Sequence, residues 1–242
     1  MNIGIIGYGR MGRTIEGICK KRGHAIGAVI DLENHDDIHR MRDKNIDVAI
    51  EFTQPQSAYD NIAALLRQGI PVVSGTTGWI DQMAQIQDQV IAHETGFFYA
   101  PNYSIGVNLF FEISEYAAEL MNRFPEFDVH VEEIHHIHKL DSPSGTAIHL
   151  ANNIIGKSDR KTSWVNAQSD QEQELQILSD RQPDVPGIHS AVFTGPHDII
   201  DLKHTASSRM GFATGAVLAA EFLNGKKGIY NMKDLLKSFE KL

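Results

Sequence analysis

The sequence predicts an α/β protein in which an N-terminal doubly wound parallel sheet is followed by an α+β domain with a mixed sheet. Over residues 1–104, short apolar runs alternate with helix-like segments, which is typical of parallel strands covered by helices on both faces. After residue 104, several strand-like runs follow one another without helices between them, which indicates a mixed or antiparallel sheet.

The expected strands of the first part are short and apolar, and they fall at 3–6, 25–30, 48–52, 71–73 and 97–99. Apolar residues at helical spacing predict the helices between them, at 11–22, 57–68 and 81–93. Gly69 is a typical stop for the second of these helices.

In the second part, helices are predicted at 107–124 and 147–155, and strands at 127–136, 175–179, 188–193 and 199–204. Two further helices are expected at 212–223 and 232–239. We therefore place a first domain at 1–104 and a second domain at 105–206. The C-terminal helices, within 207–242, are expected to pack back on the first domain.

The bulk composition excludes several classes of function. The chain has 242 residues, a formal net charge of −9 and a single cysteine, Cys19. An acidic chain is a poor candidate for nonspecific binding to nucleic acid, and one cysteine excludes both an intramolecular disulfide and a zinc site built on cysteines. No signal-peptide pattern and no apolar run long enough to span a bilayer is present, so we expect a cytoplasmic protein without a membrane partner.

A glycine-rich turn follows the first expected strand and opens the first expected helix. Its pattern is Gly7-x-Gly9-x-x-Gly12, in which the first glycine permits a tight turn and the second lets a pyrophosphate approach the backbone. The third lets helix and strand pack closely, and the free amides of the helix start attract phosphate. The order strand, turn, helix favours a Rossmann-like dinucleotide site over the alternative, a glycine-rich turn without a ligand.

Asp31 ends the next apolar run, roughly 20 residues further on, where a carboxylate accepts hydrogen bonds from the adenosine ribose. A carboxylate repels a 2′-phosphate, and Leu32 follows it where an arginine would attract one. The sequence therefore predicts a preference for NADH over NADPH.

Two later loops follow strands of the same expected sheet, and the carboxyl ends of such strands meet at the cofactor crevice. Gly75, Thr76 and Thr77 offer backbone and hydroxyl groups for the nicotinamide end. In the second loop, Asn102 is a candidate partner of the carboxamide, and Tyr103 is a candidate to pack on a ring. Taken alone, each loop is also compatible with an ordinary strand-to-helix turn.

The stretch EEIHHIHKLDSPSGTA, at 132–147, crowds titratable side chains next to a turn. Three interpretations compete: a solvated strand edge, a metal site, and an acid–base site that holds an anion. His135 and His136 point to opposite faces if they end a strand, and each alone is more often a surface or packed residue than a catalyst. The stretch has no HExxH pattern, no paired cysteines and no helical pair of histidines, so no metal is expected.

The acid–base interpretation explains more of these residues. Histidine gives or takes a proton near neutral pH, and Lys139 can hold a carboxylate or donate a proton. Ser144, Gly145 and Thr146 precede a helical run, which creates a helix start with open amides that can receive an anion. Next to a nicotinamide domain, this combination suits the reduction of a small dicarboxylic substrate.

The same stretch resembles the signature of the dihydrodipicolinate reductase family, E-x-H-H-x-x-K-x-D-[AS]-P-S-G-T-A. The similarity also includes GYGRMG near the start, EFT at 51–53, SGTTG at 74–78, APNYS at 100–104 and HTASSRM at 204–210. It therefore extends over nearly the whole chain.

The resemblance implies a Rossmann domain, a substrate domain with a mixed sheet, and a homotetramer assembled through that sheet. It implies the NADH- or NADPH-dependent reduction of 4-hydroxy-2,3,4,5-tetrahydrodipicolinate to tetrahydrodipicolinate, with loss of water, in lysine and diaminopimelate biosynthesis. By motif, His135 resembles the proton donor and acceptor, and Lys139 a proton donor. The matching substrate contacts are His136, Gly145 and Thr146. The matching cofactor contacts are Gly7, Gly9, Arg10, Met11, Gly12, Asp31, Gly75, Thr76, Thr77, Ala100, Pro101, Asn102 and Tyr103.

Three features depart from the family pattern. The segment between Asp31 and Asp47 is short, which leaves fewer residues near the expected adenosine site. Leu32 stands where the family often has an arginine. Pro183 replaces a glycine in the segment 181–189, which makes that loop stiffer. None of these departures falls on the proposed acid, the lysine or the anion-binding turn.

Two other functions remain as alternatives to the reductase. A metal-dependent hydrolase would use the histidine cluster but leaves the glycine pattern unexplained, and it would lose activity with a chelator. A nicotinamide-binding sensor would bind the cofactor without turnover and leaves the His and Lys cluster without a role.

Overall fold

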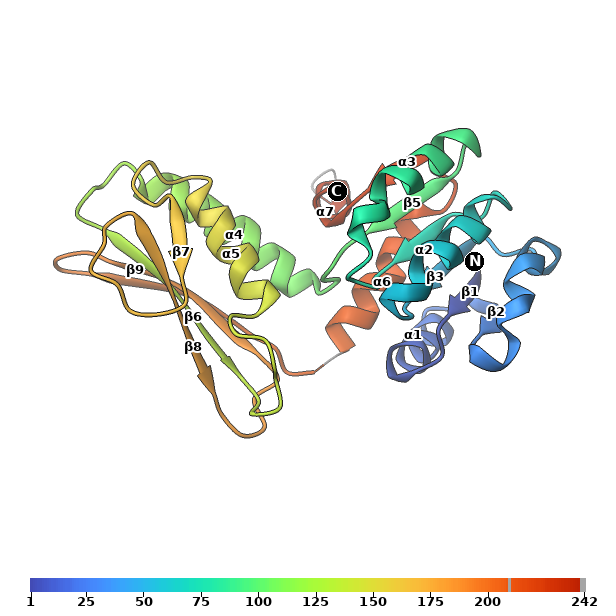
Figure 1. Cartoon of the computed structure of the whole chain (residues 1–242), viewed down its shortest axis with the longest axis horizontal. Coiled ribbons are helices and arrows are strands. Elements are labelled where there is room, and N and C mark those ends of the chain that lie inside the picture. Colours follow the sequence, from blue (N-terminus) through green and yellow to red (C-terminus); the bar gives the residue numbers. More distant parts are fainter. Residues whose placement is uncertain (209, 240–242) are drawn as a thin grey trace. The chain divides into compact units, whose positions relative to one another are not determined.

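The computed structural model describes residues 1–208 and 210–239, and the chain forms two compact units, shown in Figure 1. Unit 1 consists of Met1–Ile105 and the chain from Met210 onward, and unit 2 is the segment between them. Arg209 and 240–242, which belong to the expected C-terminal segment, lie outside the described residues.

Unit 1 contains a parallel six-stranded sheet, as the sequence predicts. The strand order is β11-β5-β4-β3-β1-β2. The strands are β1 (Asn2–Ile6), β2 (Ala25–Ile30), β3 (Val48–Glu51), β4 (Val72–Ser74), β5 (Gly96–Tyr99) and β11 (Gly228–Tyr230). The short edge strand β11 was not expected from the sequence, because three residues between glycines carry no periodic signal.

Helices cover both faces of this sheet, and residues of the strands alternate between the two layers. On β3, Val48 and Ile50 pack with α1 (Arg10–Lys21), α6 (Met210–Leu223) and α7 (Met232–Phe239). Ala49, between them, packs in the other layer with α2 (Pro55–Leu66) and α3 (Met83–Ala92). Burial on both faces explains why these strands are apolar throughout, and it confirms the doubly wound prediction.

The segment after β2 is not an open loop. It forms a kinked 3₁₀ segment, η1 (Leu32–Lys44), which the sequence analysis did not predict because only Ile38 and Met41 of it are buried. Asp31 caps its start, and Asn34 bonds back to the Asp31 amide. A second short 3₁₀ turn, η2 (Ile80–Gln82), precedes α3.

Unit 2 contains a mixed five-stranded sheet, as predicted, in the order β10-β9-β6-β8-β7. Strand β9 is antiparallel to both of its neighbours, whereas β6, β8 and β7 run parallel to one another. The strands are β6 (Asp128–His135), β7 (Ser163–Val165), β8 (Glu174–Arg181), β9 (Ile188–Thr194) and β10 (Ile199–Thr205). Strand β7, with three residues, was not expected.

Two helices, α4 (Ile105–Met121) and α5 (Gly145–Ile155), supply the apolar residues that cover one face of this sheet. On β6, Val129 and Val131 point into that core, and alternation places Glu133 and His135 on the same side. The sheet thus carries two polar side chains into its buried layer, at the end of β6. None of the helices formed by described residues is long and apolar enough to cross a membrane.

Candidate active site

The glycine-rich turn of unit 1 has the geometry that its sequence predicts. Gly7 has a φ of +90°, and a Cβ there would lie 2.1 Å from the Phe52 carbonyl oxygen. A Cβ on Gly12 would lie 2.2 Å from the Gly7 carbonyl oxygen, so only glycine lets α1 approach the turn. A Cβ on Gly9 would meet no atom within 4 Å, so this glycine faces open space.

The start of α1 fits the pyrophosphate of a dinucleotide. No side chain caps the helix at Gly9, and its first turn has no acidic residue. The first amides of a helix have no intrahelical acceptor, and the helix dipole favours an anion there. Arg10 is exposed and Met11 half-buried at this helix start, so the basic side chain is available to a phosphate.

Asp31 lies at the carboxyl end of β2, exposed to solvent. One carboxylate oxygen accepts a hydrogen bond from the Leu32 amide at 2.9 Å, and the carboxylate keeps further acceptor capacity for ribose hydroxyls. The Leu32 side chain is 91% exposed beside it. The residue that follows Asp31 is therefore uncharged and exposed.

A buried carboxyl group, Glu51, holds together the loops that follow β3 and β4. It accepts hydrogen bonds from the hydroxyls of Thr53, Ser74 and Thr76, and from the Thr53 amide. Burial raises the pKa of Glu51 despite these donors. The Thr76 side chain is itself buried and donates to Glu51, so the expectation that its hydroxyl faces a cofactor is wrong. Thr77 is exposed.

The expectation that the Tyr103 ring packs on a ligand is also wrong. Tyr103 is 2% exposed, and its hydroxyl donates to the Ser74 carbonyl oxygen at 2.7 Å. The ring packs between Phe52 and Phe98, and its burial raises the pKa of the phenol. A tyrosine in a loop resembles a ligand-binding residue in the sequence, but here it closes the core beneath the loops.

The remaining residues of these loops have mixed surroundings. A Cβ on Gly75 would lie 2.2 Å from the Phe52 ring, so the glycine allows the loop to pass over this ring. Ala100 is buried, whereas Pro101 is exposed. The Asn102 side-chain oxygen accepts the Ser104 amide at 2.9 Å, which shapes the turn before α4.

In unit 2, His135 ends β6 in a buried position, with 7% of its surface exposed. Its Nδ1 lies 3.3 Å from Glu133 Oε2, and its ring lies against that of His189 from β9, with 4.9 Å between the ring centres. Burial alone would raise the pKa of Glu133, but its polar contacts with His135, Ser144 and Ser179 outweigh burial and hold the pKa below its usual range. Glu133 is therefore an ionised, buried carboxylate.

The start of α5 lies against the same carboxylate. The Ser144 amide donates to Glu133 Oε1 at 3.0 Å, and the Ser144 hydroxyl caps the helix by accepting from the Ala147 amide. The amides of Gly145 and Thr146 belong to the first turn, where no intrahelical acceptor exists. A Cβ on Gly145 would meet no atom within 4 Å. The open space at this helix start is compatible with the anion receptor that the sequence predicts.

Lys139 lies in the loop between β6 and α5, with its Nζ 2.9 Å from Asp141 Oδ1. The Asp141 side chain is 57% exposed, and the hydrogen bond from Lys139 lowers the pKa of Asp141. A solvated ion pair of this kind contributes little stability, so Lys139 can exchange Asp141 for another carboxylate at low cost.

His136 and His138 follow β6, and their ring centres lie 6.2 Å apart. The structure thus divides the histidines of the cluster, with His135 buried beside Glu133 and the other two in the loop. A different set, Glu133, His135 and His189, brings three potential metal-ligand atoms within 4.8 Å of one another. The sequence pattern did not reveal this set, because His189 comes from a separate strand.

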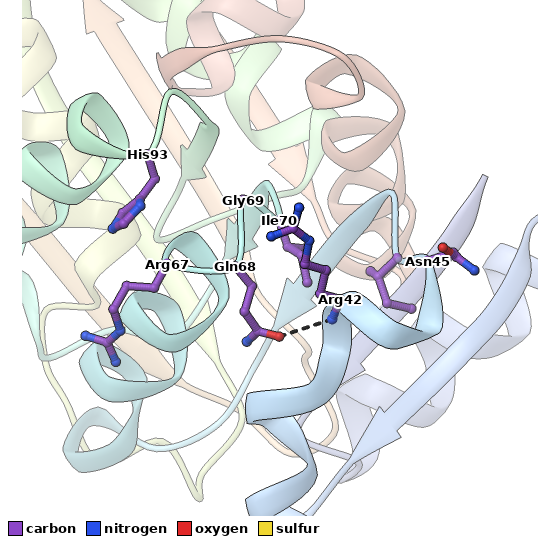
Figure 2. Close-up of a pocket in the computed structure, with 8 residues that line it drawn as sticks. Arg42, Asn45, Arg67, Gln68, Gly69, Ile70 and His93 are labelled. Carbon is purple, nitrogen blue, oxygen red and sulfur yellow. Dashed lines mark hydrogen bonds between the residues drawn. The ribbon is translucent and has the colours of Figure 1, made fainter.

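Unit 1 contains a hollow of about 450 Å³, and Figure 2 shows the residues that line it. The hollow lies where η1, α2 and α3 end, and its lining includes Arg42, Arg67 and His93. Cations at helix C-termini offset the exposed carbonyl groups there, which is a structural role. Ligands of open parallel sheets bind at the opposite edge, at the carboxyl ends of the strands.

Comparison with known proteins bears on both units. The family model "Dihydrodipicolinate reductase, N-terminus" matches residues 1–103, and the model "Dihydrodipicolinate reductase, C-terminus" matches residues 106–236. The chain belongs to the dihydrodipicolinate reductase family. The family resemblance inferred from the sequence is thereby confirmed.

Individual members of the dihydrodipicolinate reductase family are similar over most of the chain. The 4-hydroxy-tetrahydrodipicolinate reductase of Christiangramia forsetii is 46% identical over the full length of both chains. The enzyme of that name from Neisseria meningitidis is 34% identical, over 88% of this chain and 81% of its own. The dipicolinate-bound dihydrodipicolinate reductase from Paenisporosarcina sp. TG-14 shares the fold, with a TM-score of 0.80 at 23% identity, and the match covers 97% of this chain and 99% of that one.

Several residues around these groups were not predicted as catalytic or binding residues, although some stand inside the sequence motifs. Glu133 opens the signature and His189 ends the segment 181–189, but only the fold brings them to His135. Glu51 likewise lies inside a motif, EFT, but only the fold brings Thr76 to it. Strand alternation was the available signal, since it predicts that Glu133 shares a face with the apolar Val131.

Proposed function

We propose that this chain catalyses the NADH- or NADPH-dependent reduction of 4-hydroxy-2,3,4,5-tetrahydrodipicolinate to tetrahydrodipicolinate, with release of water. Family membership supports this reaction. The observation that carries it is the buried Glu133 carboxylate, which contacts both a candidate proton donor, His135, and the open start of α5. A proton donor beside an anion receptor is what reduction of a small dicarboxylate requires.

In this proposal, unit 1 binds the cofactor, which supplies the hydride. Gly7, Gly9 and Gly12 shape the backbone around the pyrophosphate, and Arg10 adds a cation. Asp31 accepts the ribose hydroxyls. Glu51 fixes the loops beyond β3 and β4, so that Gly75 and the exposed Thr77 meet the nicotinamide side. Met11 belongs with the pyrophosphate turn. The remaining proposed contacts on the nicotinamide side are the backbone of Thr76 and Tyr103, Ala100, Pro101 and Asn102.

Unit 2 binds the substrate carboxylates and supplies the proton. The amides of Gly145 and Thr146 receive one carboxylate, with His136 beside them. Lys139 leaves Asp141 to hold a carboxylate or to donate a proton. His135 donates a proton from Nε2 to the substrate as the hydride arrives, and solvent reprotonates the ring afterwards. The dipicolinate held by the Paenisporosarcina protein is a planar dicarboxylate of the same kind.

A homotetramer assembled through the mixed sheet is part of the same proposal. The helices α4 and α5 cover one face of this sheet, whereas Ile199 and Ile200 on β10 stay 68% and 36% exposed. Light scattering coupled to size-exclusion chromatography measures the assembly. A mass of one chain, 26.9 kDa, at assay concentration would contradict the tetramer.

The first experiment mixes the purified protein with NADH and freshly prepared 4-hydroxy-tetrahydrodipicolinate and follows the absorbance of the reduced nicotinamide. We expect a loss that depends on both the substrate and the protein, with or without EDTA. A protein that binds NADH but gives no loss with NADH or NADPH is a sensor and not a reductase. Activity that EDTA abolishes and Zn²⁺ restores would assign a metal to Glu133, His135 and His189 instead.

A further inference from the structure

The two oxygens of the Glu133 carboxylate have different partners. Oε1 accepts hydrogen bonds from the Ser144 amide at 3.0 Å and from the Ser179 hydroxyl at 2.8 Å. Oε2 lies 3.3 Å from His135 Nδ1 and 3.7 Å from His189 Nε2. One oxygen thus holds the start of α5, and the other faces the imidazole rings.

The second oxygen needs a proton donor, and His135 is the best placed group to supply it. An ionised carboxylate with no exposed side-chain surface is costly unless its oxygens are hydrogen-bonded. The Arg181 guanidinium lies 3.7 Å from Oε1, the oxygen that already accepts two hydrogen bonds. His189 is neutral, because burial and the neighbouring His135 lower its pKa to about 3, and its Nε2 already lies 3.2 Å from the Ser144 hydroxyl.

His135 Nδ1 and Glu133 Oε2 are both buried, and neither atom makes a well-aligned hydrogen bond within the described part of the chain. At 3.3 Å, a small rotation of the ring completes the bond between them. The other ring nitrogen, Nε2, lies toward Gly187, where a Cβ would come within 3.1 Å of it. The absence of a side chain at Gly187 keeps room around this nitrogen.

We propose that Glu133 is a positioning residue for the reaction. It keeps a proton on Nδ1 of His135, so that Nε2 is the nitrogen that exchanges a proton with the substrate, and it fixes the amides of α5 relative to that nitrogen. A carboxylate that orients a histidine in this way sets its tautomer and stabilises its cationic form. The inference deepens the proposed function, because it rests on His135 as the proton donor.

The test uses the full-length protein labelled with ¹⁵N-histidine, with the ring signals of His135 assigned by their loss in H135N. In the neutral ring of the wild type, we expect Nδ1 to carry the proton and Nε2 to be bare. In Glu133→Gln, the amide group can donate to Nδ1, so the proton should move to Nε2. The matched control, Glu132→Gln, lies on the same strand but on its opposite face, half-exposed beside His130, and it should leave the tautomer unchanged.

Steady-state kinetics supplies the second readout. Glu133→Gln should lower kcat by tenfold or more while the Kd for NADH stays the same, and Glu132→Gln should change neither. Glu133→Asp keeps the charge and should retain the Nδ1 proton. If Glu133→Gln does not fold, the wild-type spectrum alone still decides, because a neutral His135 with its proton on Nε2 would overturn the proposal.

The two proposals fail in different ways. An active wild type with an unchanged tautomer and an unchanged kcat in Glu133→Gln would refute the role of Glu133 and leave the reductase in place. A wild type that binds NADH, shows the expected tautomer and never reduces the substrate would refute the reductase. In that case the pairing of Glu133 with His135 would remain.

Discussion

At the scale of residues, the surroundings of each histidine set its chemistry. His135 faces a buried carboxylate, and His189, one strand away, is kept neutral by its burial. His130 lies on the opposite side of β6, half-exposed beside Glu132. Three imidazoles in one sheet thus have three different surroundings, and of the three His135 lies nearest to the ionised Glu133, with its Nδ1 3.3 Å from Oε2.

Replacing the proposed acid tests this assignment directly. His135→Ala should lower kcat by roughly a hundredfold, since general acid catalysis contributes factors of this order, with little change in the Kd for NADH. The control His130→Ala alters the same strand on its other face and should keep the wild-type rate. A near-normal kcat in His135→Ala would exclude His135 as the main acid.

Lys139 should contribute to both binding and proton transfer. Lys139→Ala is expected to lower kcat and raise KM together, because one side chain serves both steps. Asp141→Asn removes the carboxylate that competes for Lys139, so it should lower the substrate KM by up to about fivefold, the value of an exposed ion pair. An effect of Lys139→Ala on NADH binding alone would contradict the assignment.

The choice of cofactor depends on a single exposed position. We expect the wild type to have a higher kcat/KM with NADH than with NADPH, because Asp31 repels a 2′-phosphate and Leu32 offers it no cation. Leu32→Arg should raise kcat/KM for NADPH by about tenfold through a charge-assisted bond to the phosphate. A wild type that clearly prefers NADPH would show that another residue binds the phosphate.

At the scale of elements, the turn before α1 gives a test of cofactor binding that does not disturb folding. Gly9 has a negative φ, so Gly9→Ala is compatible with the backbone, but its methyl group would occupy the space next to the helix start. We expect the Kd for NADH to rise by about tenfold or more.

The matched control for this change lies in the same helix. Gly17→Ala also adds a methyl group in open space, in the middle of α1 and away from its first turn. Alanine favours helix by about 1 kcal/mol over glycine, so this variant should be slightly more stable and bind NADH normally. Equal Kd values in both variants, measured by fluorescence titration, would place the pyrophosphate elsewhere.

Local patterns in the sequence predicted the long elements, because helical spacing and apolar runs express which face is buried. The turn at Gly7 and the open start of α5 could also be predicted, since glycine spacing and helix caps are local. Contacts made across the fold could not be predicted. Each of these contacts joins residues from separate strands or loops. They are the packing of Tyr103 in the core, the hydrogen bond of Thr76 to Glu51 and the contact of His189 with His135.

At the scale of the whole molecule, stability should depend on pH through unit 2. An unfolded histidine takes up a proton below about pH 6.5, whereas His189 in the fold does not until about pH 3. The unfolded state therefore binds more protons between these values, and stability falls as the pH is lowered through this window. The loss from this site is at most about 1.4 kcal/mol for each pH unit.

Urea unfolding at pH 7, 5.5 and 4.5 measures this effect. The chain has two tryptophans, and Trp79→Phe leaves Trp164 of β7 as a reporter of unit 2. His189→Gln in this background should lose less stability on acidification than its parent. His197→Gln, at an exposed turn position, should lose as much as the parent, and identical pH slopes in all three proteins would refute the role of His189.

The division of unit 1 into two stretches of chain has a consequence for biosynthesis. The strands of 1–105 are made first, but α6 and α7, which cover one face of their sheet, are made only after all of unit 2. Unit 2 is continuous and can complete its core while α1 is the one helix of the three that already covers this face of the unit 1 sheet. A nascent chain from which unit 2 has emerged but α6 has not would therefore expose apolar surface of unit 1 to chaperones, although unit 2 can already fold.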